Sequence, residues 1–337
     1  MTDVSLLEAI PGPREVSSPR SSLNRAAVLW RDLRRYLNYF FQRRGFTTAM
    51  QPPLVSDLVI RAAKTIRGRD RPPAIMVHGI MPRSGTVYLG QLLRLHPEIH
   101  AYPHQLWELP ALMQSPRVMG LAKGFLLEYK PNLGRMAEGD FLPLFGASLL
   151  AYLYEDSPPS SRLLVKSPSV QYITHFYSMF PHEYLVLLVR DGRDVVHSTL
   201  RTWPKLTFLQ ACLRWRRSAD AVLSAKDAFQ GSREDQYFFA RFEEAISDPS
   251  KFVRALCRHS GLDADRFPFD QIDSIKVIGS SKLTIPGETV EWRWLPKPKG
   301  FQPTGHWQKW PSTRKLMFKA VAGRQLMDLG YGDNLDW

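Results

Sequence analysis

The chain has 337 residues, with 45 Lys and Arg against 32 Asp and Glu, so its formal net charge is +13. This length suits one large α/β domain or two smaller ones. The two cysteines, Cys212 and Cys257, exclude a disulfide framework and a cysteine-based metal site. The basic excess favours anionic partners: nucleotides, anionic glycans, membrane surfaces or nucleic acid.

We divide the chain into an N-terminal segment, 1–72, and a domain, 73–337. The first 21 residues, rich in Pro, Ser and Arg, predict a mobile tail. Residues 23–41 place apolar side chains at helical spacing among arginines, which predicts a basic amphipathic helix. Two interpretations of this helix stay open: packing on the domain, or peripheral contact with an anionic membrane.

The apolar runs fall far short of the about 20 residues that a membrane span needs. No basic stretch followed by an apolar one indicates a secretory signal. We therefore expect a cytoplasmic protein, with a peripheral position at the inner face of a membrane as the alternative.

A strand, a glycine loop and a helix follow one another from residue 74. Residues 74–78 predict a buried strand, 79–85 a loop, and the apolar spacing from Thr86 onward a helix packed on a sheet. This order aims backbone N–H groups and a helix N-terminus at one anion.

The loop differs from the nucleotide P-loop, G-x-x-x-x-G-K-[ST]. Counted from Gly79, Thr86 occupies the Ser/Thr position, but Ser84 replaces the second Gly and Gly85 replaces the Lys. The cation is Arg83 instead. The loop thus suits a phosphate-like group without the usual Lys-plus-magnesium handling of a nucleoside triphosphate.

Three histidines, His96, His100 and His104, come four residues apart and would form a metal-binding face on a helix. Pro97 and Pro103 disfavour a continuous helix there. We expect no metal site, and instead a loop beside the phosphate loop.

Residues 162–165 predict a strand that ends at Lys166, and a Lys at such a position points at the ligand crevice of an open α/β sheet. Before it, 113–153 predicts helices with breaks, which could form a mobile cap over a ligand site. After it, 184–189 predicts a second buried strand.

Arg190 ends the strand 184–189, and Ser198 lies eight residues later on a helix. A guanidinium fork and a hydroxyl at this spacing can converge on one phosphate. We interpret Arg193 and Asp194 as a local pair of the turn and helix start.

The remaining elements are expected as follows: a helix within 203–229, a strand at 236–242, a helix from Asp248, a loop over 272–310, and a last helix from a Ser312 cap to Leu326.

Two motifs resemble those of one family, the sulfotransferases, which use 3′-phosphoadenosine 5′-phosphosulfate (PAPS). Pro82-Arg83-Ser84-Gly85-Thr86 is similar to their 5′-phosphosulfate loop, P-[KR]-S-G-T-[TS], although Val87 replaces the usual second hydroxyl residue. Arg190 and Ser198 match the spacing of their 3′-phosphate site. The resemblance covers about residues 74–330. It implies a P-loop-like, three-layer α/β fold with a central parallel sheet flanked by helices.

The resemblance also implies roles. Arg83 would stabilise charge on the bridging oxygen of the leaving nucleotide, and Lys166, from a K-[ST]-P motif, would support the sulfonate. Phe242 would stack near the adenine, and Lys282 and Lys309 would reach phosphate from a lid loop. The donor-binding residues implied are Arg83, Ser84, Gly85, Thr86, Val87, Arg190, Ser198, Phe242, Lys282 and Lys309.

Sulfotransferases place the catalytic base, His or Glu, near residues 96–108. The family's H-P-[DE]-x-x-x-P-P-E pattern puts its Glu at His104, and a His needs little pKa change to act near neutral pH. We rank His104 first, Glu108 second and His100 third. No metal is expected, because protein cations can balance the single negative charge of a sulfonate.

We therefore predict a sulfotransferase that moves a sulfonate from PAPS to a hydroxyl or amine of a small molecule, glycan, glycolipid or other lipid-like alcohol, with no nucleic-acid partner. Nothing in the sequence indicates an oligomeric state. One alternative is a P-loop kinase or NTPase, although this chain lacks the Lys that such proteins carry before the residue at the Thr86 position. The other is a non-enzymatic nucleic-acid- or membrane-binding protein, argued from charge alone.

Overall fold

The computed structural model of the chain describes residues 51–101, 108–155, 157–278, 294–296 and 298–337. The predicted helix at 23–41, His104 and Lys282 lie outside the described residues.

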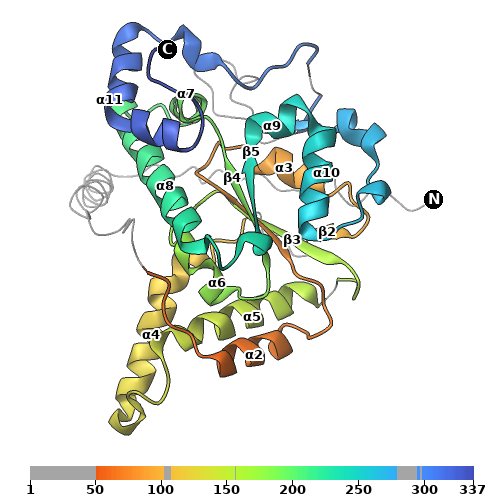
Figure 1. The fold of residues 1–337 in the computed structure, drawn as a ribbon, viewed down its shortest axis with the longest axis vertical. Helices are drawn as coiled ribbons and strands as arrows, with labels where there is room; N and C mark the ends of the chain where they lie inside the picture. Colours follow the sequence, from red (N-terminus) through yellow and green to blue (C-terminus); the bar gives the residue numbers. More distant parts are fainter. Residues whose placement is uncertain (1–50, 102–107, 156, 279–293, 297) are drawn as a thin grey trace, which may run out of the picture. The chain divides into compact units, whose positions relative to one another are not determined.

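A five-stranded parallel sheet forms the centre of the described structure (Figure 1), with strand order β2-β3-β1-β4-β5. Its strands are β1 (Ile75–Gly79), β2 (Ile99–Ala101), β3 (Arg162–Ser167), β4 (Tyr184–Val189) and β5 (Tyr237–Arg241). A short antiparallel pair, β6 (Val277–Ile278) and β7 (Trp294–Leu295), lies apart from it. The predicted strands at 74–78, 162–165, 184–189 and 236–242 are therefore confirmed to within a few residues.

Helices cover both faces of this sheet (Figure 1), which confirms the predicted three-layer α/β fold. They are α2 (Asp57–Ile66), α3 (Thr86–Leu93), α4 (Ser115–Glu128), α5 (Phe141–Tyr154), α6 (Phe176–Met179), α7 (Gly192–Thr202), α8 (Phe208–Phe229), α9 (Phe242–Ser247), α10 (Pro249–Ser260) and α11 (Ser312–Asp328).

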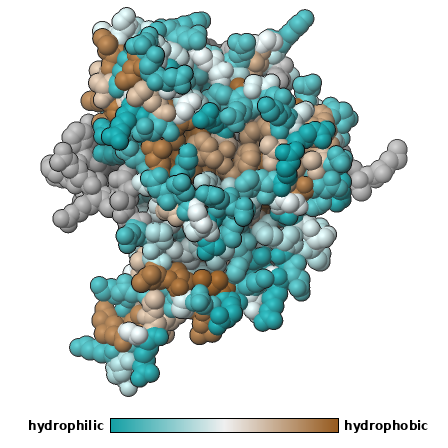
Figure 2. Space-filling model, in the orientation of Figure 1, coloured by the Kyte–Doolittle hydropathy of each residue, from teal (hydrophilic) through white to brown (hydrophobic). Residues whose placement is uncertain are grey.

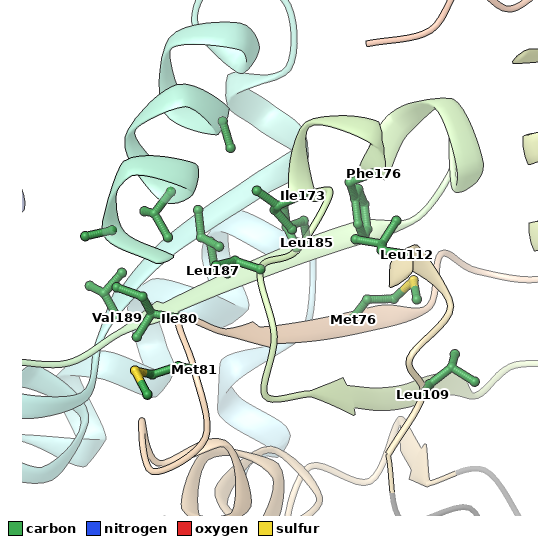
Figure 3. Packing of buried hydrophobic residues seen from close by; sticks show 14 of the residues in the cluster. Met76, Ile80, Met81, Leu109, Leu112, Ile173, Phe176, Leu185, Leu187 and Val189 are labelled. Atoms are coloured by element: carbon green, nitrogen blue, oxygen red, sulfur yellow. The ribbon is translucent and has the colours of Figure 1, made fainter. Parts of the chain in front are cut away.

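Alternate strand residues supply two separate apolar cores. Met76, Leu185 and Leu187 point to one face and meet Phe176 of α6 (Figure 3), together with buried residues of α5, α7, α8 and α11. Val77 points to the other face, where α3, α9 and α10 pack. Both faces of a parallel sheet are buried in this way, which is why the strands read as continuous apolar runs.

The strand order changes direction at β1. The chain places β3 and then β2 on one side of β1, and β4 and β5 on the other. The loops that leave β1 and β4 are therefore neighbours, and the Ile80 N–H donates to the Leu188 carbonyl at 2.8 Å. Ligands of open α/β sheets bind in the crevice at such a point.

The helix expected within 203–229 is α8, which begins at Phe208 because Thr207 and Gln210 form a reciprocal capping box there. One predicted helix start differs from the structure. The expected Ser312 cap is wrong, since Pro311 occupies the N-cap position of α11 and Ser312 is its first residue. Asp248 caps α10 as expected, accepting from the Lys251 N–H at 2.9 Å.

A buried ion pair ties α2, which falls within the predicted N-terminal segment, to the start of β4. Arg67 Nε lies 2.9 Å from Glu183 Oε1, and the other oxygen of Glu183 accepts from the Ala74 N–H at 2.5 Å. Burial raises the pKa of Glu183 to about 7, against the opposing effect of Arg67.

Replacing Arg67 by Met is expected to lower the free energy of unfolding by about 3 to 5 kcal/mol, because Glu183 would stay buried without its partner. Urea denaturation measures the change. Arg61→Met, on the exposed side of the same helix, is the matched control and should change stability little.

The loss should depend on pH. Because the pKa of Glu183 is about 7 in the folded state rather than 4.5, Glu183 stays protonated to a higher pH in the folded than in the unfolded chain. Its contribution to stability therefore falls as the pH rises from 4.5 to about 7. The Arg67→Met deficit should thus be larger at the alkaline side of the window than at the acidic side. An equal deficit on both sides would contradict this account of Glu183.

Candidate active site

The loop after β1 has an unusual backbone. Arg83 has φ +79° and Gly85 has φ +97°, both in the left-handed region that L side chains rarely adopt. A Cβ on Gly85 would meet the ring of Phe242, so only glycine fits there. The backbone thus turns sharply into α3, whose first N–H groups have no partner within the helix.

The two predicted phosphate sites meet at Arg190. From the end of β4, its Nη1 donates to the Arg83 carbonyl at 2.7 Å and its Nη2 to the Pro303 carbonyl at 2.6 Å. Its guanidinium lies 4.6 Å from the ring centroid of Phe242. Ser198 of α7 belongs to the same cluster, because its Oγ accepts from Arg83 Nε at 3.0 Å.

The two arginines bring two positive charges together in this cluster. Burial and the nearby charge of Arg190 lower the pKa of Arg83 to about 10. Burial also lowers the pKa of Arg190, opposed by Asp194 and Glu243. An anion bound between the two guanidinium groups would offset this cost of burying like charges.

Two buried polar atoms of the cluster have no hydrogen-bond partner among the described residues: Ser84 Oγ and Arg190 Nε. Buried polar groups are seldom left unsatisfied. Both lie in the elements that the sequence assigns to phosphate binding.

Lys166 and Glu108 form a second charged pair. Lys166 Nζ lies 3.7 Å from Glu108 Oε1, and the Leu109 N–H donates to the Lys166 carbonyl at 2.9 Å. Burial raises the pKa of Glu108 and lowers that of Lys166, while each partner opposes the shift of the other. The structure therefore brings Glu108, the second candidate base, close to Lys166, the cation that was predicted to support the sulfonate.

A cavity of about 1170 Å³ is lined by Arg190 and Ser198 of the cluster. Arg83, Gly85, Thr86 and Val87 line it at the loop, and Glu108 lines it too. Its apolar walls come from other elements: Trp203, Ile246, Ile272, Ile275, Val277, Ile278 and Phe301. This size suits a nucleotide together with part of a second ligand.

The remaining predicted site residues differ in burial and position. Phe242 is buried beside Gly85, whereas Lys309 has an exposed side chain and does not line the cavity. His100 lies in the edge strand β2, and His96 has a structural place, with its Nε2 2.8 Å from the Asp263 carbonyl. In the described residues no group of His, Cys, Asp and Glu could hold a metal ion.

Residues 301–309, here called the strap, lie against α7. The carboxylate of Asp194 accepts from the N–H groups of Gly305 at 2.7 Å and His306 at 2.8 Å. His306 also stacks on His197, with ring centroids 5.6 Å apart. The strap supplies the Pro303 carbonyl to Arg190, so its position governs the orientation of that guanidinium.

Arg193 of α7 also contacts the strap, through Trp307. Its guanidinium pairs with Asp191 at 2.7 Å and lies 3.8 Å from the ring centroid of Trp307 and 4.5 Å from that of Trp337. Arg193 thus makes a local contact at the start of α7, as expected, whereas Asp194 of the same turn reaches the strap instead.

The sequence did not reveal the strap's contacts. Pro303 acts through its backbone carbonyl, which carries no signal in residue type. Asp194 pairs with a segment 111 residues later in the chain, and such long-range pairing has no local pattern. Only the lid loop implied by the family resemblance pointed to this region.

Replacing Arg193 by Gln should loosen the strap, because the ion pair and both ring contacts are lost. We expect amide hydrogen exchange at Gly305 and His306 to accelerate about tenfold or more. Arg324→Gln, an exposed arginine on α11, is the control. Unchanged exchange in the strap, or equal acceleration throughout α10, would contradict a local support.

Comparison with known proteins gives one family. The model of the sulfotransferase family matches residues 73–266, more than half of the chain. The chain is 22% identical over 197 residues to protein-tyrosine sulfotransferase 1 of Danio rerio, covering 55% of this chain and 52% of that protein. It is 25% identical over 176 residues to the Rattus norvegicus protein of the same name, covering 49% and 45%. The chain thus spans about half the length of these relatives.

Solved structures give low similarity. The sulfotransferase domain of the Synechococcus PCC 7002 olefin synthase has a TM-score of 0.46 and 19% identity, covering 76% of this chain and 96% of that one. A sulfotransferase from Alicyclobacillus acidocaldarius has a TM-score of 0.45 and 16% identity, covering 78% and 97%. On the family match, which spans the loop after β1, Lys166, Arg190 and Ser198, the chain belongs to the sulfotransferase family.

Proposed function

We propose that this protein transfers a sulfonate group from PAPS to an acceptor hydroxyl or amine. The observation that carries the proposal is the meeting of Arg83, Arg190 and Ser198 beside the N-terminus of α3. Arg83 follows β1, Arg190 follows β4 and Ser198 lies on α7, and the three form one largely buried cluster at a cavity large enough for a nucleotide.

The residues present fit such a donor. A nucleotide with a 3′-phosphate and a 5′-phosphosulfate carries two anionic ends, and the cluster offers two arginines for them. The unpartnered Ser84 Oγ and Arg190 Nε are donors that a bound anion would satisfy. Arg190 and Ser198 would hold the 3′-phosphate, and the loop at Ser84, Gly85 and Thr86 the phosphosulfate.

PAPS supplies an activated sulfonate whose transfer leaves 3′-phosphoadenosine 5′-phosphate. Arg83 would stabilise the negative charge that develops on the departing nucleotide, and Lys166 would stabilise the transferred sulfonate. Both side chains are held in position before binding, Arg83 through Ser198 and Lys166 beside Glu108. Positioning and electrostatics therefore supply most of the acceleration.

The acceptor proton needs a base. We assign this role to His104, with Glu108 as the alternative, because Glu108 lines the cavity 3.7 Å from Lys166. An ion pair with Lys166 favours a structural role for Glu108, since a base engaged by a cation is a weaker proton acceptor.

The acceptor class is the least constrained part of the proposal. The apolar walls around Trp203 and Phe301 suit an alcohol on an apolar or ring-shaped molecule, such as a lipid-like alcohol, glycolipid or glycan. The relatives' names would instead point to a tyrosine hydroxyl. A panel of aryl, sugar and lipid alcohols separates these classes.

Calorimetry with 3′-phosphoadenosine 5′-phosphate, ADP and ATP in EDTA tests the donor site. We expect the 3′-phosphorylated nucleotide to bind much more tightly, and Arg190→Ala to weaken it about tenfold to hundredfold through loss of charged hydrogen bonds. A preference for ATP, or indifference to the 3′-phosphate, would favour a kinase instead.

A glycine pair controls this experiment. Gly85→Ala brings a Cβ against Phe242 and should abolish nucleotide binding. Gly134→Ala has the same kind of positive φ, +79°, but meets nothing within 4 Å. It carries a similar backbone strain away from the site and should bind normally.

For the base, His104→Ala should lower kcat by about 100-fold or more, with nucleotide affinity unchanged. Glu108→Gln should have a smaller effect. If Glu108→Gln gives the larger loss, and activity of the parent rises with pH through the raised pKa of Glu108, then Glu108 is the base. Radiolabelled sulfonate transfer to the best acceptor of the panel provides the rate.

A further inference from the structure

Exposed apolar side chains concentrate on one part of the described surface. Eight of its fifteen exposed large hydrophobic residues lie between residues 113 and 152. On α4 and the segment after it they include Leu121, Phe125, Tyr129 and Leu133, and on α5 Phe145 and Tyr152. Clusters of this kind mark binding surfaces.

These residues, here called the arm surface, belong to two helices that contact each other. The rings of Phe125 on α4 and Phe141 on α5 lie 5.5 Å apart and join the two helices. On α5, Phe145 and Tyr152 continue from Phe141 at helical spacing. Figure 1 shows α4 projecting away from the sheet, and Figure 2 shows apolar side chains gathered over α4 and α5 in the lower part of the view.

The exposed apolar side chains point to more than one side of α4. Leu121 is 66% and Phe125 57% exposed, and they share one side of the helix. Leu127, 45% exposed, comes six residues after Leu121 and therefore points about 240° around the axis. Helix α4 therefore has no single apolar stripe and exposes apolar side chains on two of its sides.

Cations accompany these side chains. Residues 113–138 contain Arg117, Lys123, Lys130 and Arg135, all exposed, against the two carboxylates of Glu128 and Glu138. Exposed Lys and Arg beside Leu, Phe and Tyr are the composition of helices that lie in the interface of an anionic bilayer. None of the described helices has the length and apolar character needed to cross one.

We propose that the arm surface docks on the surface of an anionic lipid bilayer, with its Leu, Phe and Tyr side chains entering the headgroup boundary and its Lys and Arg side chains meeting the lipid phosphates. The arm lies in the chain between Glu108 and Lys166, which both belong to the site. Docking through it would therefore hold the protein by the segment that links these two groups.

Co-sedimentation of the full chain with vesicles tests the proposal, comparing phosphatidylcholine alone with phosphatidylcholine containing phosphatidylglycerol. We expect binding to the anionic vesicles. The double variant Leu121→Glu/Phe125→Glu should weaken it about tenfold or more, because two apolar side chains are lost and two carboxylates that anionic lipids repel are gained. Leu316→Glu, on an apolar residue of α11 that is 63% exposed, is the matched control and should bind normally.

Two further measurements distinguish the arm surface from a second docking segment and from a dimer contact. Leu33→Glu/Leu37→Glu alters the apolar positions of the predicted 23–41 helix. If that variant loses vesicle binding while the arm variant keeps it, the arm surface is not the docking site. If the parent chain binds no vesicles but forms a dimer in light scattering that the arm variant abolishes, the surface is a contact between copies, and the proposal is wrong.

Discussion

The guanidinium of Arg190 joins three segments that are far apart in the sequence. It ends β4, donates to the carbonyl of Arg83 in the loop after β1, and donates to the carbonyl of Pro303 in the strap. Phe242, at the start of α9, lies under its face. The shape of the cationic cluster depends on this one side chain, because its fork fixes the distance between the two loops.

Arg190 is expensive to bury, and the surrounding structure shows how the cost is offset. Asp194 and Glu243 lie close enough to favour its charged form. Their own carboxylates are used elsewhere, by the strap amides and by the Asp191 N–H. Both carboxylates keep their negative charge in these hydrogen bonds and so help to balance Arg190. An anionic ligand bound beside Arg83 and Arg190 would offset the repulsion between their two positive charges.

The same arrangement explains the strap and Arg193. Trp307 and Trp337 enclose Arg193, and Asp194 on the next residue holds the strap amides. Arg193 and Asp194, adjacent residues of α7, thus hold the strap through different contacts. Elsewhere in the domain, the arm surface leaves apolar side chains exposed that no part of this cluster uses.

The sequence by itself determined the parts of the protein that local patterns encode. The buried runs at 184–189 and 162–165 specified strands. The glycine loop from Gly79 predicted an anion-binding turn, and the spacing of Arg190 and Ser198 predicted a phosphate site. Tertiary structure alone decided the rest. The strand order put the loops after β1 and β4 side by side, which local residue patterns do not encode. Pro303 contributes a backbone carbonyl, Asp194 a long-range contact, and Arg193 a support built from two distant tryptophans, and each of these is a product of chain folding rather than of residue type.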